Sequence, residues 1–277
     1  MTTNCNVNKD TQLCISIASH PSNFGTTLHN AAYAALGLNF VYKSFAIIDL
    51  PGALIGVRAL NIRGCSVSMP FKEAVIPLLD ELDETARAIG AVNTVVNEAG
   101  KLKGYNTDAI GAYEALRSIG ARPGDNILLL GAGGVARAIL FALRQAGFRR
   151  VQVANRDPRK IEQLNSILPC DTVLWDNRHH AQADLLINAT SLGMSPNADC
   201  TPMEAHCLHQ TKAVMDVVVS PMETRLIAAA RSIGLAVAPG HYMSLMQAIA
   251  QFKLYTGEEP PRALLQSKLR ELSSSPQ

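Results

Sequence analysis

The feature that most constrains the fold is the stretch from residue 126 to residue 156. It reads NILLLGAGGVARAILFALRQAGFRRVQVANR. Residues 127–130 form a short apolar run without helical periodicity, which is typical of a strand buried on both faces of a parallel sheet. A glycine-rich turn follows, then an Ala/Leu/Arg-rich helical run at 135–145 and a second apolar run at 151–154. The stretch therefore predicts one βαβ unit.

The glycine-rich turn matches the G-x-G-x-x-G/A pattern of dinucleotide-binding sites. Gly131 allows the tight turn, Gly133 lets the backbone approach a pyrophosphate, and Ala136 lets helix and strand pack closely. The helix N-terminus then offers free N–H groups and a positive dipole end to the phosphates. A purely structural turn is the alternative, and the flanking strand and helix favour the dinucleotide site. The predicted cofactor-binding residues of the turn are Gly131, Ala132, Gly133, Gly134, Val135 and Ala136.

Basic side chains follow the second predicted strand, at the place where a dinucleotide-binding domain contacts the adenosine ribose. The chain has Asn155 and Arg156 there, with Lys160 close behind. A guanidinium can pair with a 2′-phosphate, whereas the Asp or Glu typical of NAD sites would repel it. The nearby acid, Asp157, precedes Pro158 and is expected to cap the next helix. These residues favour NADP over NAD, and the alternative is that they are solvated surface charges.

Composition narrows the class of protein. The chain has 277 residues and a net charge of +2, enough for one large or two moderate domains and without a tract that suggests nucleic acid. No apolar run approaches the ~18 residues that cross a bilayer, and the polar start does not resemble a signal peptide. Six scattered cysteines without C-x-x-C spacing suggest neither a zinc site nor a disulfide framework. We expect a cytoplasmic protein without a metal, nucleic-acid or membrane partner.

Alternating strands and helices predict two α/β domains. A substrate-binding domain is expected to comprise residues 1–108 and 241–277, and a nucleotide-binding domain residues 109–240. Expected strands lie at 13–18, 39–45, 64–69, 172–174, 185–188, 213–217 and 236–238, with a hairpin of 91–96 and 102–105. Expected helices lie at 26–36, 50–60, 109–119 and 242–255, with two more beginning at Lys72 and just after Arg156, the latter ending near residue 168.

Several separated motifs agree on one family. They are SVSMPFKE at 66–73, GAVNT at 90–94, YNTD at 105–108, the glycine turn, Asn155-Arg156, NATSLGM at 188–194 and MSLMQ at 243–247. In this order they resemble the shikimate dehydrogenase family over nearly the whole chain. The resemblance implies reversible NADP-linked hydride transfer between shikimate and 3-dehydroshikimate. It also implies an α/β substrate domain, a Rossmann-type doubly wound NADP domain and C-terminal helices that return to the first domain, in a monomer or homodimer.

The resemblance assigns Lys72 and Asp108 as the catalytic pair. Oxidation of a secondary alcohol needs a group that removes the hydroxyl proton while hydride leaves the adjacent carbon. A lysine amine can accept this proton, and a carboxylate can orient the lysine and share the substrate hydroxyl. In isolation Lys72 would be read as a surface lysine and Asp108 as a helix cap.

Further roles carry over by motif position. Asn93 and Gln247 are expected to bind substrate hydroxyls, and Ser68 keeps a hydroxyl where the family usually has Thr. The expected nicotinamide-side residues are Thr190, Met194 and Gly240.

Two departures concern the substrate carboxylate. The family holds it with a Ser-x-Ser-Pro loop, and this chain has Asn23 and Gly25 at the serine positions, flanked by Ser22 and Thr26. Val219 stands where the family has Tyr. A lost donor to a carboxylate costs on the order of 1–3 kcal/mol. We expect hydride-transfer chemistry with a rebuilt carboxylate clamp that involves Ser22 and Asn23, and turnover of shikimate or a close ring acid below that of the housekeeping enzyme.

Three other functions remain open. A quinate/shikimate dehydrogenase would be distinguished by use of NAD and tolerance of an extra ring hydroxyl. A non-catalytic NADP-binding regulatory protein would not need Lys72 and Asp108. An enzyme like methylene-tetrahydrofolate dehydrogenase shares the two-domain plan, but the motifs around Lys72 and Asp108 argue against it.

Overall fold

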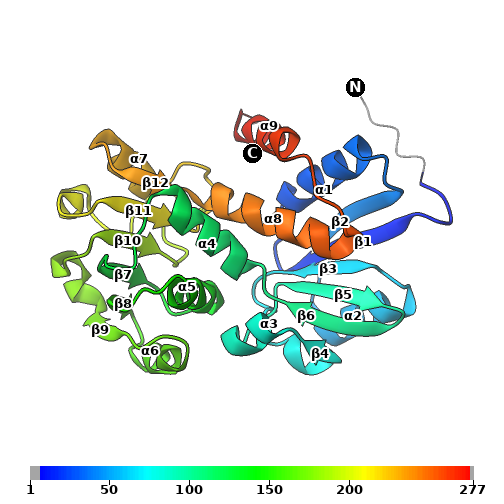
Figure 1. Ribbon diagram of the computed structural model, residues 1–277, viewed down its shortest axis with the longest axis horizontal. Helices are drawn as coiled ribbons and strands as arrows, with labels where there is room; N and C mark the ends of the chain where they lie inside the picture. Colours follow the sequence, from blue (N-terminus) through cyan, green and yellow to red (C-terminus); the bar gives the residue numbers. More distant parts are fainter. Residues whose placement is uncertain (1–6, 275–277) are drawn as a thin grey trace. The chain divides into compact units, whose positions relative to one another are not determined.

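The computed structural model describes residues 7–274, so Cys5 and the extreme ends of the expected first domain lie outside the described residues. The described chain divides into two compact units. The first comprises residues 7–107 and 247–274, and the second comprises residues 108–246. Each unit is built on its own six-stranded sheet with helices (Figure 1). The predicted α/β class with a second, doubly wound sheet is confirmed.

The sheet of the first unit has the strand order β2-β1-β3-β5-β6-β4. Strands β1, β2 and β3 are parallel, and β5 runs antiparallel to both β3 and β6. The predicted hairpin is therefore confirmed as β5 and β6. The strands are β1 Gln12–Ala18, β2 Phe40–Ala46, β3 Gly64–Val67, β4 Glu81–Leu82, β5 Thr94–Glu98 and β6 Lys101–Tyr105.

Helices of the first unit begin at recognisable caps. The Asp49 carboxylate accepts the N–H of Gly52 and starts α2, and Asp83 accepts the N–H of Ala86 and starts α3. Helix α1 packs on β2 and on α9. An apolar cluster that includes Leu54 of α2 forms the core. The helices are α1 Phe24–Ala35, α2 Leu50–Ala59, α3 Glu84–Ile89 and α9 Arg262–Ser274, with the 3₁₀ helix η1 Ile76–Leu78.

The helix predicted to begin at Lys72 is wrong. The chain forms turns there, followed by the short η1. The Lys72 carbonyl accepts the N–H of Val92 at 2.8 Å, so the start of the expected helix is bonded to another segment instead. Pro77 lacks an N–H and cannot extend an α-helical ladder. Lys72 therefore lies in a turn, five residues after the end of β3, and its backbone is hydrogen-bonded to Val92.

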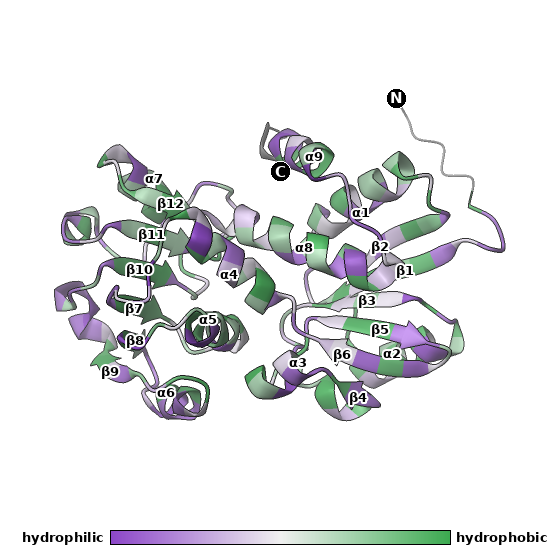
Figure 2. Ribbon diagram, in the orientation of Figure 1, coloured by the Kyte–Doolittle hydropathy of each residue, from purple (hydrophilic) through white to green (hydrophobic). Residues whose placement is uncertain are grey.

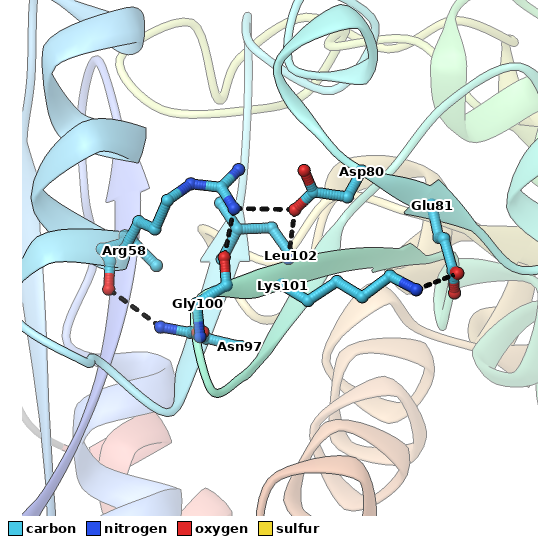
Figure 3. A network of polar contacts seen from close by, with 8 residues as sticks. Arg58, Asp80, Glu81, Asn97, Gly100, Lys101 and Leu102 are labelled. Atoms are coloured by element: carbon cyan, nitrogen blue, oxygen red, sulfur yellow. Dashed lines mark hydrogen bonds and ion pairs between the residues drawn. The ribbon is translucent and has the colours of Figure 1, made fainter.

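A polar network fixes the β5–β6 hairpin to α2 (Figure 3). The Arg58 guanidinium bonds the Asp80 carboxylate at 2.8 Å and also donates to the Gly100 carbonyl. Asp80 in turn accepts the N–H of Leu102 at 2.6 Å. The Arg58 hydrogen bond, followed by that of Leu102, lowers the pKa of the Asp80 carboxyl. The network holds the far end of the hairpin whose other end carries the predicted site residue Asn93.

The sheet of the second unit is fully parallel, with the order β12-β11-β10-β7-β8-β9. This is the doubly wound dinucleotide-binding order, in which the order of the strands reverses between β7 and β10 while all strands stay parallel. Both strands are apolar (Figure 2) and buried. The strands are β7 Ile127–Leu130, β8 Val151–Asn155, β9 Asp171–Leu174, β10 Leu185–Asn188, β11 Ala213–Asp216 and β12 Ala236–Ala238.

One helix of the second unit is shorter than predicted. Helix α6 ends at Glu162, and the 3₁₀ helix η2 replaces the expected α-helix up to residue 168. The Ser166 hydroxyl donates to the Gln163 carbonyl at 3.0 Å, so a side chain competes with the backbone for this acceptor. The elements are α4 Asp108–Ser118, α5 Gly134–Gln145, α6 Arg159–Glu162, α7 Arg225–Ser232, η2 Gln163–Ser166, η3 Trp175–His180 and η4 Ala205–Leu208.

The last long helix, α8, spans Gly240–Thr256 and ends within the first unit. There the Arg63 side chain donates to the Tyr255 carbonyl at 2.9 Å. The Tyr255 ring lies directly over Gly64 of β3, so a Cβ on Gly64 would overlap it. The C-terminal helices thus return to the first sheet, as expected. Within residues 7–274 every helix is too short or too polar to cross a membrane.

Gly64→Ala is expected to destabilise the protein by about 1–3 kcal/mol, because the added methyl group overpacks the contact with Tyr255. Gly56→Ala in α2 is the matched control. A Cβ there meets nothing within 4 Å, and alanine in a helix interior is expected to stabilise by about 0.5–1 kcal/mol. Urea unfolding measures both changes. Equal midpoints for the two variants would contradict the close packing of α8 on β3.

Candidate functional site

The glycine turn after β7 leaves room for a ligand. Gly131 has a φ of +104°, and a Cβ there would lie 3.0 Å from the Ala189 carbonyl oxygen and 3.1 Å from Thr190 Cγ2. A side chain at residue 131 is therefore excluded by both backbone conformation and contact. Gly133 is extended and exposed, and a Cβ there would meet nothing within 4 Å. The space in front of Gly133 is open.

Helix α5 presents its N-terminus to this space. Its first backbone bond runs from the Arg137 N–H to the Gly133 carbonyl at 3.1 Å, so the N–H groups of Gly134, Val135 and Ala136 have no intrahelical acceptor. The first turn contains no acidic residue, and Ala136 is fully buried. The unbonded N–H groups at the N-terminus of α5, and the turn that contains Ala132, fit the pyrophosphate of a dinucleotide.

The end of β8 fits a 2′-phosphate. The expected N-cap is one residue off, because Pro158 rather than Asp157 is the N-cap of α6. The Asp157 carboxylate still accepts the N–H of Arg159 at 3.2 Å, and it pairs with the Arg159 guanidinium at 3.0 and 3.1 Å. This pairing lowers the pKa of the Asp157 carboxyl and offsets its charge. The Asn155 side chain bonds the Asp157 carbonyl at 2.8 Å and fixes the turn. Arg156 and Lys160 are exposed, and within residues 7–274 neither is found in an ion pair, although the charge of Lys160 also acts on Asp157. Two cations therefore remain available to an anion.

The expected nicotinamide-side residues lie in one part of the second unit. Thr190 follows β10, and both its N–H and its hydroxyl donate to the Asn188 side-chain oxygen, at 3.0 and 2.7 Å. Met194 is half-buried in the same loop. Gly240 is buried against the backbone of Val218, and a Cβ there would overlap the Val218 carbonyl oxygen. Only glycine fits at residue 240.

In the first unit the predicted substrate ligand Asn93 is fully buried in a polar cluster. Its side-chain oxygen accepts the Thr107 N–H and the Thr94 hydroxyl, both at 2.8 Å, and its amide donates to the Thr107 hydroxyl at 3.0 Å. These bonds hold the Asn93 side chain in one orientation. Lys72 is half-buried in the turn described above. In the second unit Asp108 is 2% exposed and is the first residue of α4.

Helix α8 brings two glutamines to the first unit. Gln247 is half-buried, and no hydrogen-bond partner is found for it within residues 7–274. Gln251, one turn later, is 3% exposed and donates to the hydroxyls of Thr94 at 2.9 Å and Ser66 at 3.1 Å. The sequence analysis missed Gln251. Its i,i+4 spacing from Gln247, which places both on one helix face, is the signal that could have revealed it.

The remaining predicted ligands are exposed at the ends of β1 and β3. Asn23 stands at the N-cap of α1 but makes no capping bond with its side chain. The Ser22 carbonyl accepts the Ser44 hydroxyl at 3.1 Å. Ser68 is anchored by its backbone N–H, which donates to Ile17 at 3.0 Å. The structure therefore leaves the side chains of Asn23 and Ser68 accessible.

A cluster of hydroxyls beside Gly25 was also missed. The Ser44 hydroxyl lies 2.9 Å from both the Ser16 and the Thr26 hydroxyls, and Ser16 and Ser44 are paired neighbours on β1 and β2. All three are half-buried. We call Ser16, Thr26 and Ser44 the hydroxyl cluster. A sequence reading could have found it only by aligning β1 with β2 in register, which fixes which serines share a face.

No group of three His, Cys, Asp or Glu side chains within residues 7–274 could hold a metal ion.

Comparison with known proteins identifies two family domains in the chain. Residues 23–95 match the family model described as the shikimate dehydrogenase substrate binding domain. Residues 114–221 match the model described as shikimate / quinate 5-dehydrogenase. The two matches fall in the first and second units respectively.

Whole-length relatives agree with these matches. A shikimate dehydrogenase-like protein of Haemophilus influenzae is 39% identical, covering 94% of this chain and 96% of the relative. The shikimate dehydrogenase (NADP(+)) of Moorella thermoacetica is 42% identical, covering 93% and 92%. The structure of shikimate 5-dehydrogenase from Thermus thermophilus in complex with NADP(H) and shikimate superposes with a TM-score of 0.85 at 35% identity, covering 94% and 99%.

The two turn glycines make separable predictions. Gly133→Ala is expected to leave the thermal unfolding temperature unchanged, because its Cβ enters open space, but to weaken NADP⁺ binding about tenfold or more by blocking the approach to the backbone. Gly131→Ala is expected to lower both stability and affinity. Calorimetric titration and thermal unfolding measure the two effects. Full NADP⁺ affinity in folded Gly133→Ala would exclude this turn as the pyrophosphate site.

Proposed function

The chain belongs to the shikimate dehydrogenase family, and we propose that it is an NADP-dependent oxidoreductase acting on shikimate or a close cyclic hydroxy acid. The reaction is reversible hydride transfer between the ring alcohol and the ketone, 3-dehydroshikimate in the case of shikimate. The observation that carries the cofactor assignment is the pair of available cations, Arg156 and Lys160, beside a phosphate-binding turn. A carboxylate at the same place would favour NAD.

We propose that Lys72 and Asp108 form the catalytic pair. NADP⁺ supplies the hydride acceptor when it is bound. Lys72 takes the proton from the substrate hydroxyl, and the turn that replaces the expected helix holds its backbone through the bond with Val92. Asp108 lies at the N-terminus of α4, where the helix dipole stabilises its negative charge. Asn93 is the proposed ligand of a ring hydroxyl, and its bonds with Thr107 already fix its side chain, so binding would cost little side-chain entropy.

The substrate carboxylate requires a different clamp from that of the family. Asn23 and Gly25 replace the two serines that the resemblance implies there. The N-terminus of α1 begins at this place, its first turn contains no acidic residue, and Asn23 leaves it uncapped. The hydroxyl cluster lies beside it, with Thr26 contributed by α1 itself. We propose that the carboxylate binds the α1 N-terminus, the hydroxyl cluster and the side chains of Ser22 and Asn23, with turnover below that of the housekeeping enzyme.

Restoring a serine at residue 25 would not rebuild the family clamp by itself. A Cβ on Gly25 would lie 3.2 Å from the Tyr42 hydroxyl oxygen and 3.3 Å from its ring. Tyr42 is 2% exposed and has little room to move. A side chain at residue 25 would therefore require Tyr42 to move. A test of the proposed carboxylate site should change the hydroxyl cluster rather than Gly25.

One alternative has a specific observation in its favour. The description of the matched second domain includes quinate, so a quinate/shikimate dehydrogenase using NAD is a competing function. It requires the site to accept an additional ring hydroxyl and a cofactor without the 2′-phosphate. A non-catalytic NADP-binding regulatory protein is the other alternative, and it does not require Lys72.

The deciding experiment measures initial rates of NADP⁺ reduction with shikimate and with quinate, each repeated with NAD⁺ and with Lys72→Ala. We expect shikimate-dependent reduction of NADP⁺ that falls by about 10²–10⁴-fold in the variant, the usual contribution of a general base. Faster turnover of quinate with NAD⁺ would favour the alternative enzyme. Tight NADP⁺ binding with no turnover of either acid would contradict the proposed reaction and favour the regulatory protein.

Ser44→Ala tests the hydroxyl cluster. Loss of its hydroxyl is expected to raise KM for shikimate about 5- to 100-fold with a smaller change in kcat, because the carboxylate lies away from the reacting carbon. Methyl shikimate, the neutral ester, should bind the wild type and the variant alike. Ser118→Ala is the control, since the Ser118 hydroxyl also bonds one carbonyl, that of Ala115, but Ser118 is exposed and belongs to the second unit. Equal shikimate KM values in Ser44→Ala and the wild type would exclude the cluster.

A further inference from the structure

The loop that follows β10 borders the dinucleotide site directly. Strands β7 and β10 are parallel neighbours, and the chain continues to β8 on one side and to β11 on the other. Ligands of open α/β sheets bind at this kind of switch point, outside the carboxyl ends of the strands. The close approach of Gly131 to Ala189 and Thr190 places the phosphate turn and this loop side by side. The nicotinamide half of a dinucleotide bound at the phosphate turn is therefore expected to contact the loop at residues 189–194.

One side-chain amide sets the conformation of that loop. The Asn188 oxygen accepts the N–H and the hydroxyl of Thr190, at 3.0 and 2.7 Å. The Asn188 nitrogen donates to the Leu192 carbonyl at 3.2 Å. If the amide were rotated by half a turn, its NH₂ would face the Thr190 N–H and its oxygen would face the Leu192 carbonyl. Both contacts would then be repulsive, so the loop depends on the orientation of this amide.

A buried carboxylate selects that orientation. The Asn188 nitrogen also donates to Asp216 Oδ1 at 3.0 Å, and Asp216 is fully buried at the end of β11. An ionised carboxylate can only accept hydrogen bonds, so it forces the NH₂ side of the amide toward itself. Asp216 is in turn held by the Val218 N–H at 3.0 Å and the Thr224 hydroxyl at 2.6 Å. Burial raises the pKa of the Asp216 carboxyl, and the hydrogen bonds from Thr224, Val218 and Asn188 oppose this shift by stabilising the ionised form.

We propose that Asp216 is a positioning residue for the nicotinamide half of the cofactor, acting through Asn188 on Thr190. This inference rests on the proposed function and adds to it a residue that lies outside the family motifs noted in the sequence. The same carboxylate also fixes Val218, whose carbonyl lies against Gly240. The buried Asp216 carboxylate therefore fixes two backbone segments, the loop that carries Thr190 and the segment at Val218 that packs against Gly240. Thr190 and Gly240 are both expected beside the nicotinamide.

A purely structural role is the competing explanation. Thr224 caps α7 by accepting the Ile227 N–H, so Asp216 could serve only to join β11 to α7. The two explanations differ in which part of the cofactor is affected. A structural defect weakens binding of every part of the dinucleotide, whereas a mispositioned loop affects only the nicotinamide end.

The test compares the affinities of NADPH and 2′-phospho-ADP-ribose, which lacks the nicotinamide, for the wild type and Asp216→Ala. Alanine offers the Asn188 nitrogen no acceptor, so it no longer selects one orientation of the Asn188 amide. We expect the affinity for NADPH to fall about five- to tenfold while that for 2′-phospho-ADP-ribose is unchanged. In turnover, kcat is expected to fall about 10- to 100-fold, with KM for NADP⁺ changed less.

Thr224→Val gives a second route if Asp216→Ala does not fold. It removes the donor that holds Asp216 Oδ2, so the carboxylate is no longer fixed in place against Asn188, and Thr224→Ser keeps the hydroxyl as the matched control. The same selective loss of NADPH affinity in Thr224→Val, restored in Thr224→Ser, supports the proposal. Equal losses for both ligands, or no loss in a folded variant, would overturn it. Because the affinity ratio needs no substrate, it decides this point even if the wild type turns over no ring acid.

Discussion

In the second unit, the Gly131 backbone packs directly against the backbone of Ala189, and the position of the phosphate turn beside the loop after β10 depends on this contact. Parallel strands β7 and β10 end at the same edge of the sheet, and no side chain can stand between the segments that follow them. The phosphate turn and the loop after β10 therefore form one continuous surface. Helix α5 points its free N–H groups at this surface because the chain must turn back immediately after Gly133. At the end of β8 the Arg159 guanidinium pairs with the Asp157 carboxylate, and Arg156 and Lys160 remain exposed beside them.

In the first unit, buried polar side chains from distant segments form hydrogen bonds with one another. Asn93, Thr94 and Thr107 bring together the two ends of the β5–β6 region, and Gln251 joins them from α8. Every such bond in a water-free interior costs free energy if it is broken, so the cluster resists alternative packings. The same unit tolerates change at its edge. Asn23 is exposed at the N-cap of α1, and the half-buried Gly25 lies in its first turn, so replacing serines here removes donors at the edge of the unit.

The sequence predicted the elements whose patterns are local. The apolar run at Ile127–Leu130, the glycine turn and the helix after it are where the periodicity placed them, because a buried parallel strand and a capped helix have distinct signatures. It failed where a distant partner competes for the backbone. The helix expected at Lys72 is absent because Val92, twenty residues along, takes the Lys72 carbonyl. Helices α3 and α7 were missed although Asp83 and Thr224 mark their starts, since a single capping residue is a weak signal without a long apolar stripe.

The sequence by itself determined the chemistry that this protein can support. A phosphate turn, a 2′-phosphate site without a free acid, and the lysine and aspartate motifs are each written in contiguous residues, and contiguous residues fix local geometry. The side chains that complete the proposed sites can be recognised only in the folded chain. The hydroxyl cluster and Asp216 have no local pattern that distinguishes them from ordinary surface or core residues, and Gln251 has only its spacing of four residues from Gln247. Their roles arise from strand register and from the burial of partners that must satisfy one another, which are properties of the packed fold.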